Sequence, residues 1–179
     1  MKLSEVKTLK SGAELKDCIF TVAGIEFVKL SEDDGVAQVF TKECVFNSDF
    51  GKNNNFSESK VLKKLNKEIF PKLQKEIGEE NIKEFELELT SLDGLDTYGK
   101  IKTKIGLITF DMYRENVRLF DKCKLDCWWW LANPFSTSEH FNANWVLCVS
   151  PSGIIDYCNF INDFGVRPFL HFVSSIFVS

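Results

Sequence analysis

Three adjacent tryptophans, Trp128-Trp129-Trp130, constrain the fold of this chain more than any other feature. In an extended segment successive side chains point to opposite faces, so Trp129 should face away from Trp128 and Trp130. Side chains of this size must be covered on both faces, unless one face serves for binding. We expect Trp129 and Trp130 to fill the interior and Trp128 to be the exposed one.

The length of the chain favours one domain over residues 1–179. A chain of 179 residues can bury one substantial core but is short for two domains. Its 17 phenylalanines and 4 tryptophans favour a β-rich interior, in which large flat side chains fill the space between elements.

Charge and hydropathy exclude two classes of partner. The net charge of −4 gives no general attraction to nucleic-acid phosphates, so no direct nucleic-acid binding is expected. The lysines between Lys60 and Lys83 alternate with glutamates, which is typical of a solvated helix face. No stretch approaches the roughly 18 apolar residues of a membrane span, and the N-terminus lacks the apolar core of a secretory signal. We therefore expect a cytoplasmic protein without a membrane partner.

The first half of the chain predicts a hairpin followed by a helix. Residues 17–30 and 36–46 are rich in β-branched and aromatic residues, and the acidic segment 31–35 between them indicates a turn. Apolar residues then recur at helical spacing, with Ser57 or Ser59 as N-cap. Pro71 lacks an amide hydrogen, so we expect a kink or break near Phe70.

The second half predicts short strands around one short helix. Residues 85–92 alternate apolar and polar side chains as an edge strand does, and Thr109 is expected to cap a helix that follows a strand over 101–108. Four further strands are expected at 128–131, 145–149, 154–160 and 166–173.

Two motifs carry a resemblance to a known family. Trp129-Trp130-Leu131-Ala132-Asn133-Pro134 and Gly165-Val166-Arg167-Pro168 resemble the Trp-Trp-Leu-x-Ser/Asn-Pro and Gly-Val-Arg-Pro signatures of uncharacterised domains found in gut bacteria and their phages. The resemblance implies an α+β, C-type-lectin-like fold: small twisted antiparallel sheets, one or two helices and long late loops. It places an N-terminal hairpin and helix over 17–80 and the lectin-like core over 85–179. Because the family has no established function, it implies a fold and no activity.

The resemblance also separates structural from binding residues. Trp129, Trp130, Gly165, Arg167 and Pro168 belong to the motifs, and we expect Arg167 to tie the last strand to the preceding loops through its planar donors. In related scaffolds the late loops form a variable binding face, and loops on a rigid sheet are readily altered for recognition. The candidate binding residues are Trp128, Phe135, His140, Phe141, Asn142, Asn159 and Asn162.

Catalytic and metal sites have weaker sequence support. Cys123 and Cys127 with His140 suggest zinc, but a structural site needs a fourth ligand, and Cys148 and Cys158 lie ten residues apart. We expect six reduced, mostly buried cysteines and no metal. A catalytic Cys–His pair could use only His140 or His171. For glycoside hydrolysis, no two carboxylates stand out from the many candidate pairs. Glycine-rich phosphate loops are absent, so no cofactor is indicated.

Three functional hypotheses remain open. The first is a non-catalytic module from a phage, prophage or gut bacterium that binds another protein, in its narrower form an inhibitor of a host defence enzyme similar to anti-CRISPR proteins. The second is an enzyme with an unrecognised Cys–His or carboxylate site. The third is a carbohydrate-binding domain that uses an exposed tryptophan.

Overall fold

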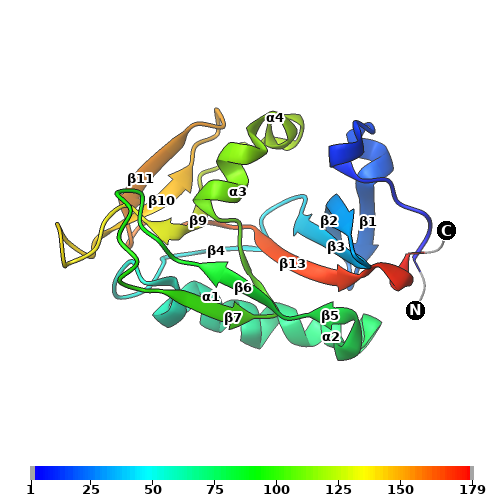
Figure 1. Cartoon of the computed structure of the whole chain (residues 1–179), viewed down its shortest axis with the longest axis horizontal. Coiled ribbons are helices and arrows are strands. Elements are labelled where there is room, and N and C mark those ends of the chain that lie inside the picture. Colours follow the sequence, from blue (N-terminus) through cyan, green and yellow to red (C-terminus); the bar gives the residue numbers. More distant parts are fainter. Residues whose placement is uncertain (1–2, 178–179) are drawn as a thin grey trace.

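Two β-sheets and a short β-ribbon form an α+β framework (Figure 1). The computed structural model describes residues 3–177. The first sheet contains, in spatial order, β1 (Ile19–Val22), β2 (Ile25–Asp33), β3 (Val36–Thr41), β13 (Pro168–Val173) and β5 (Ile82–Lys83), and β8 (Gly106–Leu107) also pairs with β13. The second contains β11 (Ile155–Asn159), β10 (Trp145–Val149), β9 (Trp129–Pro134), β12 (Phe164–Val166) and β4 (Phe46–Ser48). The ribbon pairs β6 (Phe85–Glu88) with β7 (Lys100–Thr103).

The expected α+β class is confirmed, whereas the lectin-like assignment stays a prediction. Strands from the regions 17–80 and 85–179 are mixed in both sheets, because β13 pairs with β3 and β12 pairs with β4. No helix within residues 3–177 is long and apolar enough to span a membrane.

The first helical segment begins at its predicted cap and passes through Pro71. It consists of α1 (Lys60–Lys64), a π-helical turn (Leu65–Ile69) and α2 (Phe70–Ile77). The Ser59 hydroxyl accepts a hydrogen bond from the Leu62 amide at 3.0 Å, which confirms one of the two expected caps. Pro71 lies in the first turn of α2, and the wider π-helical turn before it accommodates the missing donor without ending the helix.

A second pair of short helices follows β8. These are α3 (Phe110–Glu115) and α4 (Val117–Phe120). The Thr109 hydroxyl accepts from the Met112 amide at 3.2 Å, so the predicted cap of α3 is confirmed. Together α3 and α4 cover the opposite side of the molecule from α1 and α2 (Figure 1).

The predicted N-terminal hairpin is a three-stranded meander. A tight turn at Ala23-Gly24, with φ of 51° and 75°, divides the run 17–30 into β1 and β2. The sequence prediction missed this turn, because Ala23 is unusual at positive φ and apolar residues flank it on both sides. A second turn of the same kind, at Asp34-Gly35, falls in the predicted turn region.

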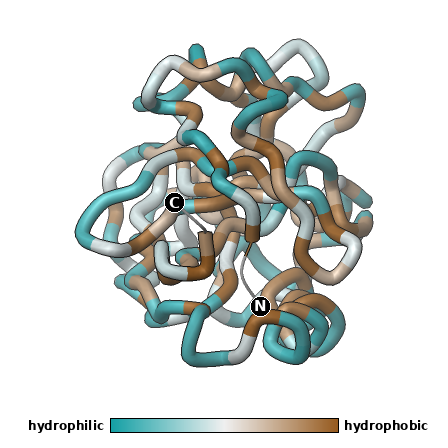
Figure 2. Tube along the Cα trace, turned by 90° about the vertical axis from the view of Figure 1, so that its right-hand side faces the viewer, coloured by the Kyte–Doolittle hydropathy of each residue, from teal (hydrophilic) through white to brown (hydrophobic). Residues whose placement is uncertain are grey.

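The tryptophan triplet divides the core as its alternation predicts. Trp130 is fully buried in one cluster with Phe50 and Leu170, whereas Trp129 is 2% exposed in another with Tyr113 and Phe120. Hydrophobic segments converge in the interior while hydrophilic loops lie outside (Figure 2). The second sheet therefore carries apolar side chains on both faces.

Arg167 lies where the chain crosses between the sheets. The predicted strand 166–173 is divided there, with β12 in one sheet and β13 in the other. The buried guanidinium donates to the carbonyls of Thr41 (2.8 Å), Lys42 (2.9 Å) and Cys123 (3.2 Å). Thr41 ends β3, after which the chain crosses from the first sheet to β4 of the second. Arg167 thus ties the connection between β12 and β13 to the one between β3 and β4, the structural role expected for it.

Gly165 and Pro168 complete the motif on either side of Arg167. The Gly165 amide donates to the Trp128 carbonyl at 2.8 Å, and a Cβ at this position would lie 2.4 Å from the Cys44 sulfur. Only glycine permits that approach without a shift of Cys44. Pro168 opens β13 opposite Leu107 of β8.

Candidate binding face

Three loops meet beside β10 and β11, at the left of Figure 1: residues 51–55, 91–99 and 135–144. The buried Asn54 side chain joins them. Its amide nitrogen donates to the carbonyls of Ser136 (2.8 Å) and Trp145 (3.0 Å), and its oxygen accepts from the Tyr98 hydroxyl at 2.7 Å. Because these contacts are made in a buried position, they fix the relative placement of the three loops.

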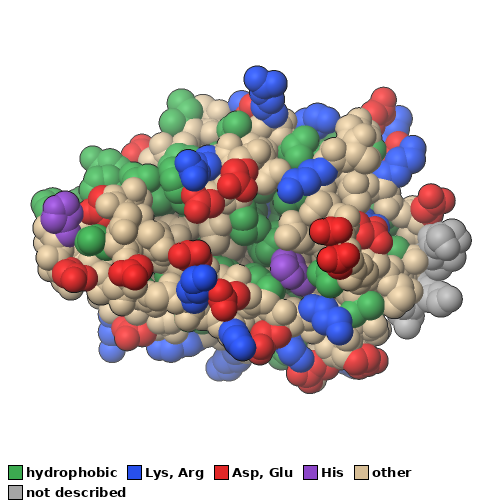
Figure 3. Space-filling model, in the orientation of Figure 1, with side chains coloured by type: hydrophobic (Ala, Val, Ile, Leu, Met, Phe, Trp, Pro, Cys, Tyr) green, Lys and Arg blue, Asp and Glu red, His purple; other side chains and the backbone are tan. Residues whose placement is uncertain are grey.

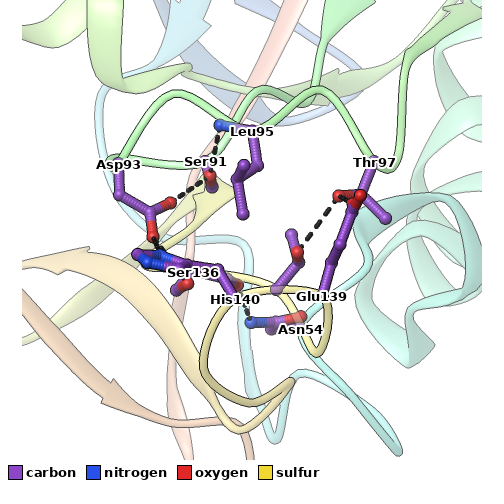
Figure 4. A network of polar contacts seen from close by, with 9 residues as sticks. Asn54, Ser91, Asp93, Leu95, Thr97, Ser136, Glu139 and His140 are labelled. Carbon is purple, nitrogen blue, oxygen red and sulfur yellow. Dashed lines mark hydrogen bonds and ion pairs between the residues drawn. The ribbon is translucent and has the colours of Figure 1, made fainter.

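Asp93 makes a second set of contacts between the loops (Figure 4). One carboxylate oxygen accepts from Ser91 at 2.5 Å, and the other accepts from Ser136 at 2.7 Å and from Nδ1 of His140 at 2.8 Å. The Ser91, His140 and Ser136 donors lower the pKa of Asp93 to about 2. The ionised carboxylate thereby holds His140 in place.

This cluster does not have the geometry of a nucleophilic triad. In a triad the serine hydroxyl donates to the imidazole, which the aspartate orients from its other nitrogen. Here both Ser136 and His140 donate to the same oxygen of Asp93. The contacts therefore support the loop rather than activate Ser136. Nearby, the Thr97 hydroxyl donates to Glu139 at 2.6 Å and adds a further tie between two of the loops.

An aromatic group covers the adjoining surface of the second sheet. The ring of Phe135 stacks on Tyr157 with centroids 4.3 Å apart, and Trp145 meets Tyr157 edge to face at 5.9 Å. Tyr157 remains 47% exposed. Tyr157 therefore presents part of its ring to solvent, while Phe135 and Trp145 hold that ring in place.

Three further aliphatic or aromatic side chains are exposed at the ends of β11 or in the neighbouring loop. Phe141 is 64% exposed, Ile154 is 66% exposed and Ile161 is 68% exposed. Ile154 and Ile161 flank the two ends of β11, and Phe141 belongs to the neighbouring loop 135–144. Among the described residues only Leu92 and Val117 are other large apolar side chains with comparable exposure. We call the set Phe141, Ile154, Tyr157 and Ile161 the apolar strip.

The segment that carries the apolar strip is acidic, and the one basic side chain beside Gly153, that of Lys124, is paired with Asp121 at 3.3 Å. Between Lys124 and Arg167 the sequence contains no lysine or arginine, but it contains four acidic residues: Asp126, Glu139, Asp156 and Asp163. Figure 3 shows hydrophobic and acidic side chains together at this end of the molecule. This gap in basic residues is visible in the sequence, but no acidic binding surface was predicted from it.

The structure brings most of the predicted binding residues together. Phe135, His140, Phe141 and Asn142 share the loop 135–144. Asn159 ends β11 and Asn162 lies in the turn that follows, which joins that loop through a hydrogen bond from the Phe160 amide to the Asn144 carbonyl at 2.9 Å. The sequence analysis missed Ile154, Tyr157 and Ile161, which it assigned only to a strand and its flanking turn.

The three predicted asparagines shape the loops. Asn142 and Asn159 accept from the amides of Asn144 (3.0 Å) and Ile161 (3.2 Å) through their side-chain oxygens. The Asn162 amide donates to the Asn159 carbonyl at 3.0 Å. Such local bonds favour turns. These residues therefore position the apolar strip.

Trp128 lies apart from this face. It precedes β9, whereas the loop 135–144 follows the other end of that strand. The Trp128 ring is half-buried and stacks on Phe164 at 5.6 Å with an interplanar angle of 20°. Trp128 is the least buried of the three tryptophans, as expected, but Phe164 covers one face of its ring.

The six cysteines are free, and burial limits their reactivity. Four of the cysteines form two close pairs that sequence spacing did not indicate. The sulfurs of Cys148 and Cys158 lie 3.2 Å apart, and those of Cys44 and Cys127 lie 3.8 Å apart. Burial raises the pKa of five of the thiols, which disfavours the reactive thiolate: those of Cys18, Cys44, Cys123, Cys148 and Cys158. Within residues 3–177 no group of three or more histidine, cysteine or acidic side chains is placed to hold a metal ion.

The histidines are not paired with these thiols. His140 contacts Asp93, and His171 packs against the rings of Phe85 (4.5 Å) and Phe169 (5.3 Å). Burial lowers the pKa of His171 to about 4, so the imidazole is neutral at physiological pH.

A pocket of about 560 Å³ lies beside α1, away from both histidines. Its lining mixes basic and acidic side chains, and Lys60 is paired with Asp49 at 2.5 Å. No cysteine or histidine lines it: the lining residues are Asp49, Gly51, Lys52, Asn53, Glu58, Lys60 and Lys63. The lining of this pocket therefore supplies neither the thiol nor the imidazole that a Cys–His site needs.

No protein-family model, curated protein or solved structure matches the chain.

Proposed function

We propose that this protein is a non-catalytic module that binds another protein through the apolar strip and the loop 135–144. The observation that carries the proposal is the exposure of Phe141, Ile154, Tyr157 and Ile161 along the edge strand β11 and in the adjoining loop 135–144. Exposed apolar side chains gathered in one place, with polar residues around them, are typical of protein interaction sites.

Rigidity of the face supports binding. Hydrogen bonds from Asn54 and to Asp93 join the three loops, and the Phe135 ring packs against Tyr157. A face that is ordered before binding loses less conformational entropy on association. Aromatic side chains such as Tyr157 and Phe141 are frequent energetic centres of interfaces, since they bury a large area with few rotatable bonds.

In its narrower form, the module is a phage or prophage protein that acts in the cytoplasm of a bacterial host and inhibits a defence enzyme by covering its surface. The family resemblance of the two motifs supports this origin. The acidic surroundings of the strip suit an enzyme with a basic working surface, because opposite charges steer association.

The two alternatives have less support. A cysteine nucleophile needs a lowered pKa, whereas burial raises the pKa of Cys123 and Cys148. Alkylation at neutral pH should therefore be slow at both positions, and one rapidly modified cysteine would favour the enzyme hypothesis. A carbohydrate site based on an exposed tryptophan loses its support because Trp128 stacks on Phe164.

Affinity capture from a bacterial lysate, with matched variants, tests the proposal. Phe141→Ser removes an exposed ring from the strip, and Val117→Ser removes an exposed apolar side chain from α4 as a control. We expect a stoichiometric partner whose capture falls by about tenfold or more with Phe141→Ser, as for an interface centre, and is unchanged with Val117→Ser. Equal capture by both variants, with unchanged thermal unfolding, would contradict the proposed face.

A further inference from the structure

The hydrogen-bond register of β11 shows which of its backbone groups face outward. β11 is an edge of the second sheet, with β10 as its neighbour. At one end the Ser150 amide donates to the Ile154 carbonyl, and at the other the Phe160 amide donates to the Asn144 carbonyl, both at 2.9 Å. In an antiparallel ladder, residues that bond to the neighbour alternate with residues that do not.

By this alternation, the amides and carbonyls of Asp156 and Cys158 form hydrogen bonds with β10. The amides and carbonyls of Ile155, Tyr157 and Asn159 therefore point away from the sheet. Two outward groups are already used, since the Tyr157 amide donates to the Asp156 carboxylate at 2.8 Å and the Asn159 carbonyl accepts from Asn162. The other outward groups are the Ile155 amide and carbonyl, the Tyr157 carbonyl and the Asn159 amide, and within residues 3–177 no second strand pairs with this edge.

We infer that an extended, basic segment of the partner pairs with β11 as an additional strand. This inference rests on the proposed function and names the chemistry of its partner. The free backbone groups supply hydrogen bonds, as in other complexes formed by strand addition. Ile154, Tyr157 and Ile161 accompany the edge as contacts for the side chains of the added strand.

Charge decides between a partner protein and a second copy of the chain. Two copies paired through β11 would bring two acidic edges together, because residues 125–166 contain no lysine or arginine and the nearby Lys124 is already paired with Asp121 at 3.3 Å. Like charges across a strand pair are destabilising. A segment with lysine or arginine has the opposite sign, and its cation can attract the Asp156 carboxylate away from the Tyr157 amide. That amide then becomes available for pairing.

Synthetic peptides test the inference on the full chain. The probe is the capped peptide Lys-Val-Thr-Lys-Val-Thr-Lys, and two controls replace lysine with glutamate or carry N-methyl groups on alternate amides. Backbone amide shifts measured by NMR report the site. We expect saturable shifts centred on residues 154–161, about tenfold weaker binding by the glutamate peptide, and loss of binding by N-methylation in the pairing register.

A matched pair of variants tests the same edge from the protein side. Ile155→Pro removes an outward amide without removing a bond to β10, whereas Ile155→Ala shortens the side chain and keeps the amide. We expect Ile155→Pro to weaken peptide binding about tenfold more than Ile155→Ala, while amide protection in β10 remains. Equal binding by both variants, binding that survives N-methylation in both registers, or shifts outside residues 154–161 would overturn the inference.

The same variants distinguish the inference from the proposed function. If Ile155→Pro captures the lysate partner as well as Ile155→Ala does, while Phe141→Ser loses it, strand pairing is wrong and the binding face stands. If Phe141→Ser also captures normally, the proposed function itself fails.

Discussion

Trp129 and Trp130 are adjacent in the chain, yet their indole rings lie in different hydrophobic clusters on opposite faces of β9. Trp130 also donates its ring N–H to the Ser48 carbonyl of β4 at 2.9 Å. The two rings thus join the second sheet to the elements above and below it. This arrangement fixes the start of β9, and the loop 135–144 departs from the other end of the same strand.

Trp128 and Trp130 should differ in their contribution to stability. Trp130→Phe removes a buried hydrogen bond and leaves the Ser48 carbonyl without that donor, which we expect to cost about 2–4 kcal/mol including the lost volume. Trp128→Phe keeps an aromatic ring against Phe164 and should cost less than about 1.5 kcal/mol. Urea unfolding measures both values. Equal costs would contradict the assignment of Trp130 to the interior.

Arg167 should not tolerate replacement by lysine. Its fork donates to three carbonyls, and its guanidinium lies over the rings of Phe40 (4.7 Å) and Trp129 (5.2 Å). A lysine cannot reproduce this planar set of donors, so we expect Arg167→Lys to lower the free energy of unfolding by about 3 kcal/mol or more. Chemical denaturation checks the value, and a loss below about 1 kcal/mol would contradict a structural role.

Much of the framework followed from local sequence patterns. The caps at Ser59 and Thr109 were predictable because a hydroxyl at the start of an apolar helical pattern satisfies a free amide. The burial of Trp129 and Trp130 on opposite faces of the sheet followed from strand alternation. These features depend on neighbouring residues alone.

Features that depend on tertiary placement were not predictable in the same way. The division of strand 166–173 at Arg167 occurs because two sheets meet there, and the apolar pattern continues through the crossing. Cys148 and Cys158 come together because Cys158 lies opposite Val146, two residues from Cys148 on the paired strand. The pairing of Asp93 with His140 joins loops 47 residues apart, which no local pattern reveals.

His171 should make stability fall in mild acid. Its pKa is about 4 in the folded protein and 6.5 ordinarily, so between these values the unfolded chain binds a proton that the folded protein does not. Stability is therefore lost as pH falls from about 6.5 to about 4, by up to about 3 kcal/mol. His171→Phe should remove this part of the pH dependence in thermal unfolding. An identical pH profile for both proteins would show that His171 is not buried as described.

Asp93 should contribute at lower pH. Its folded pKa of about 2 lies below the ordinary value of 3.8, so its stabilising contacts are present above about pH 4 and are lost as pH falls toward 2. Because the side chain is 30% exposed, we expect an effect below about 1 kcal/mol, seen as faster amide exchange in the loop 135–144. Asp93→Asn should lack this acid response. A wild-type loop whose exchange is independent of pH, after correction for intrinsic rates, would contradict the proposed support.

Hydrogen–deuterium exchange of the full chain, alone and with its captured partner, tests the binding face most directly. We predict slower exchange confined to segments covering 135–144 and 154–162, because the partner covers the apolar strip. Protection at other surfaces, with these two segments unchanged, would contradict the proposed face.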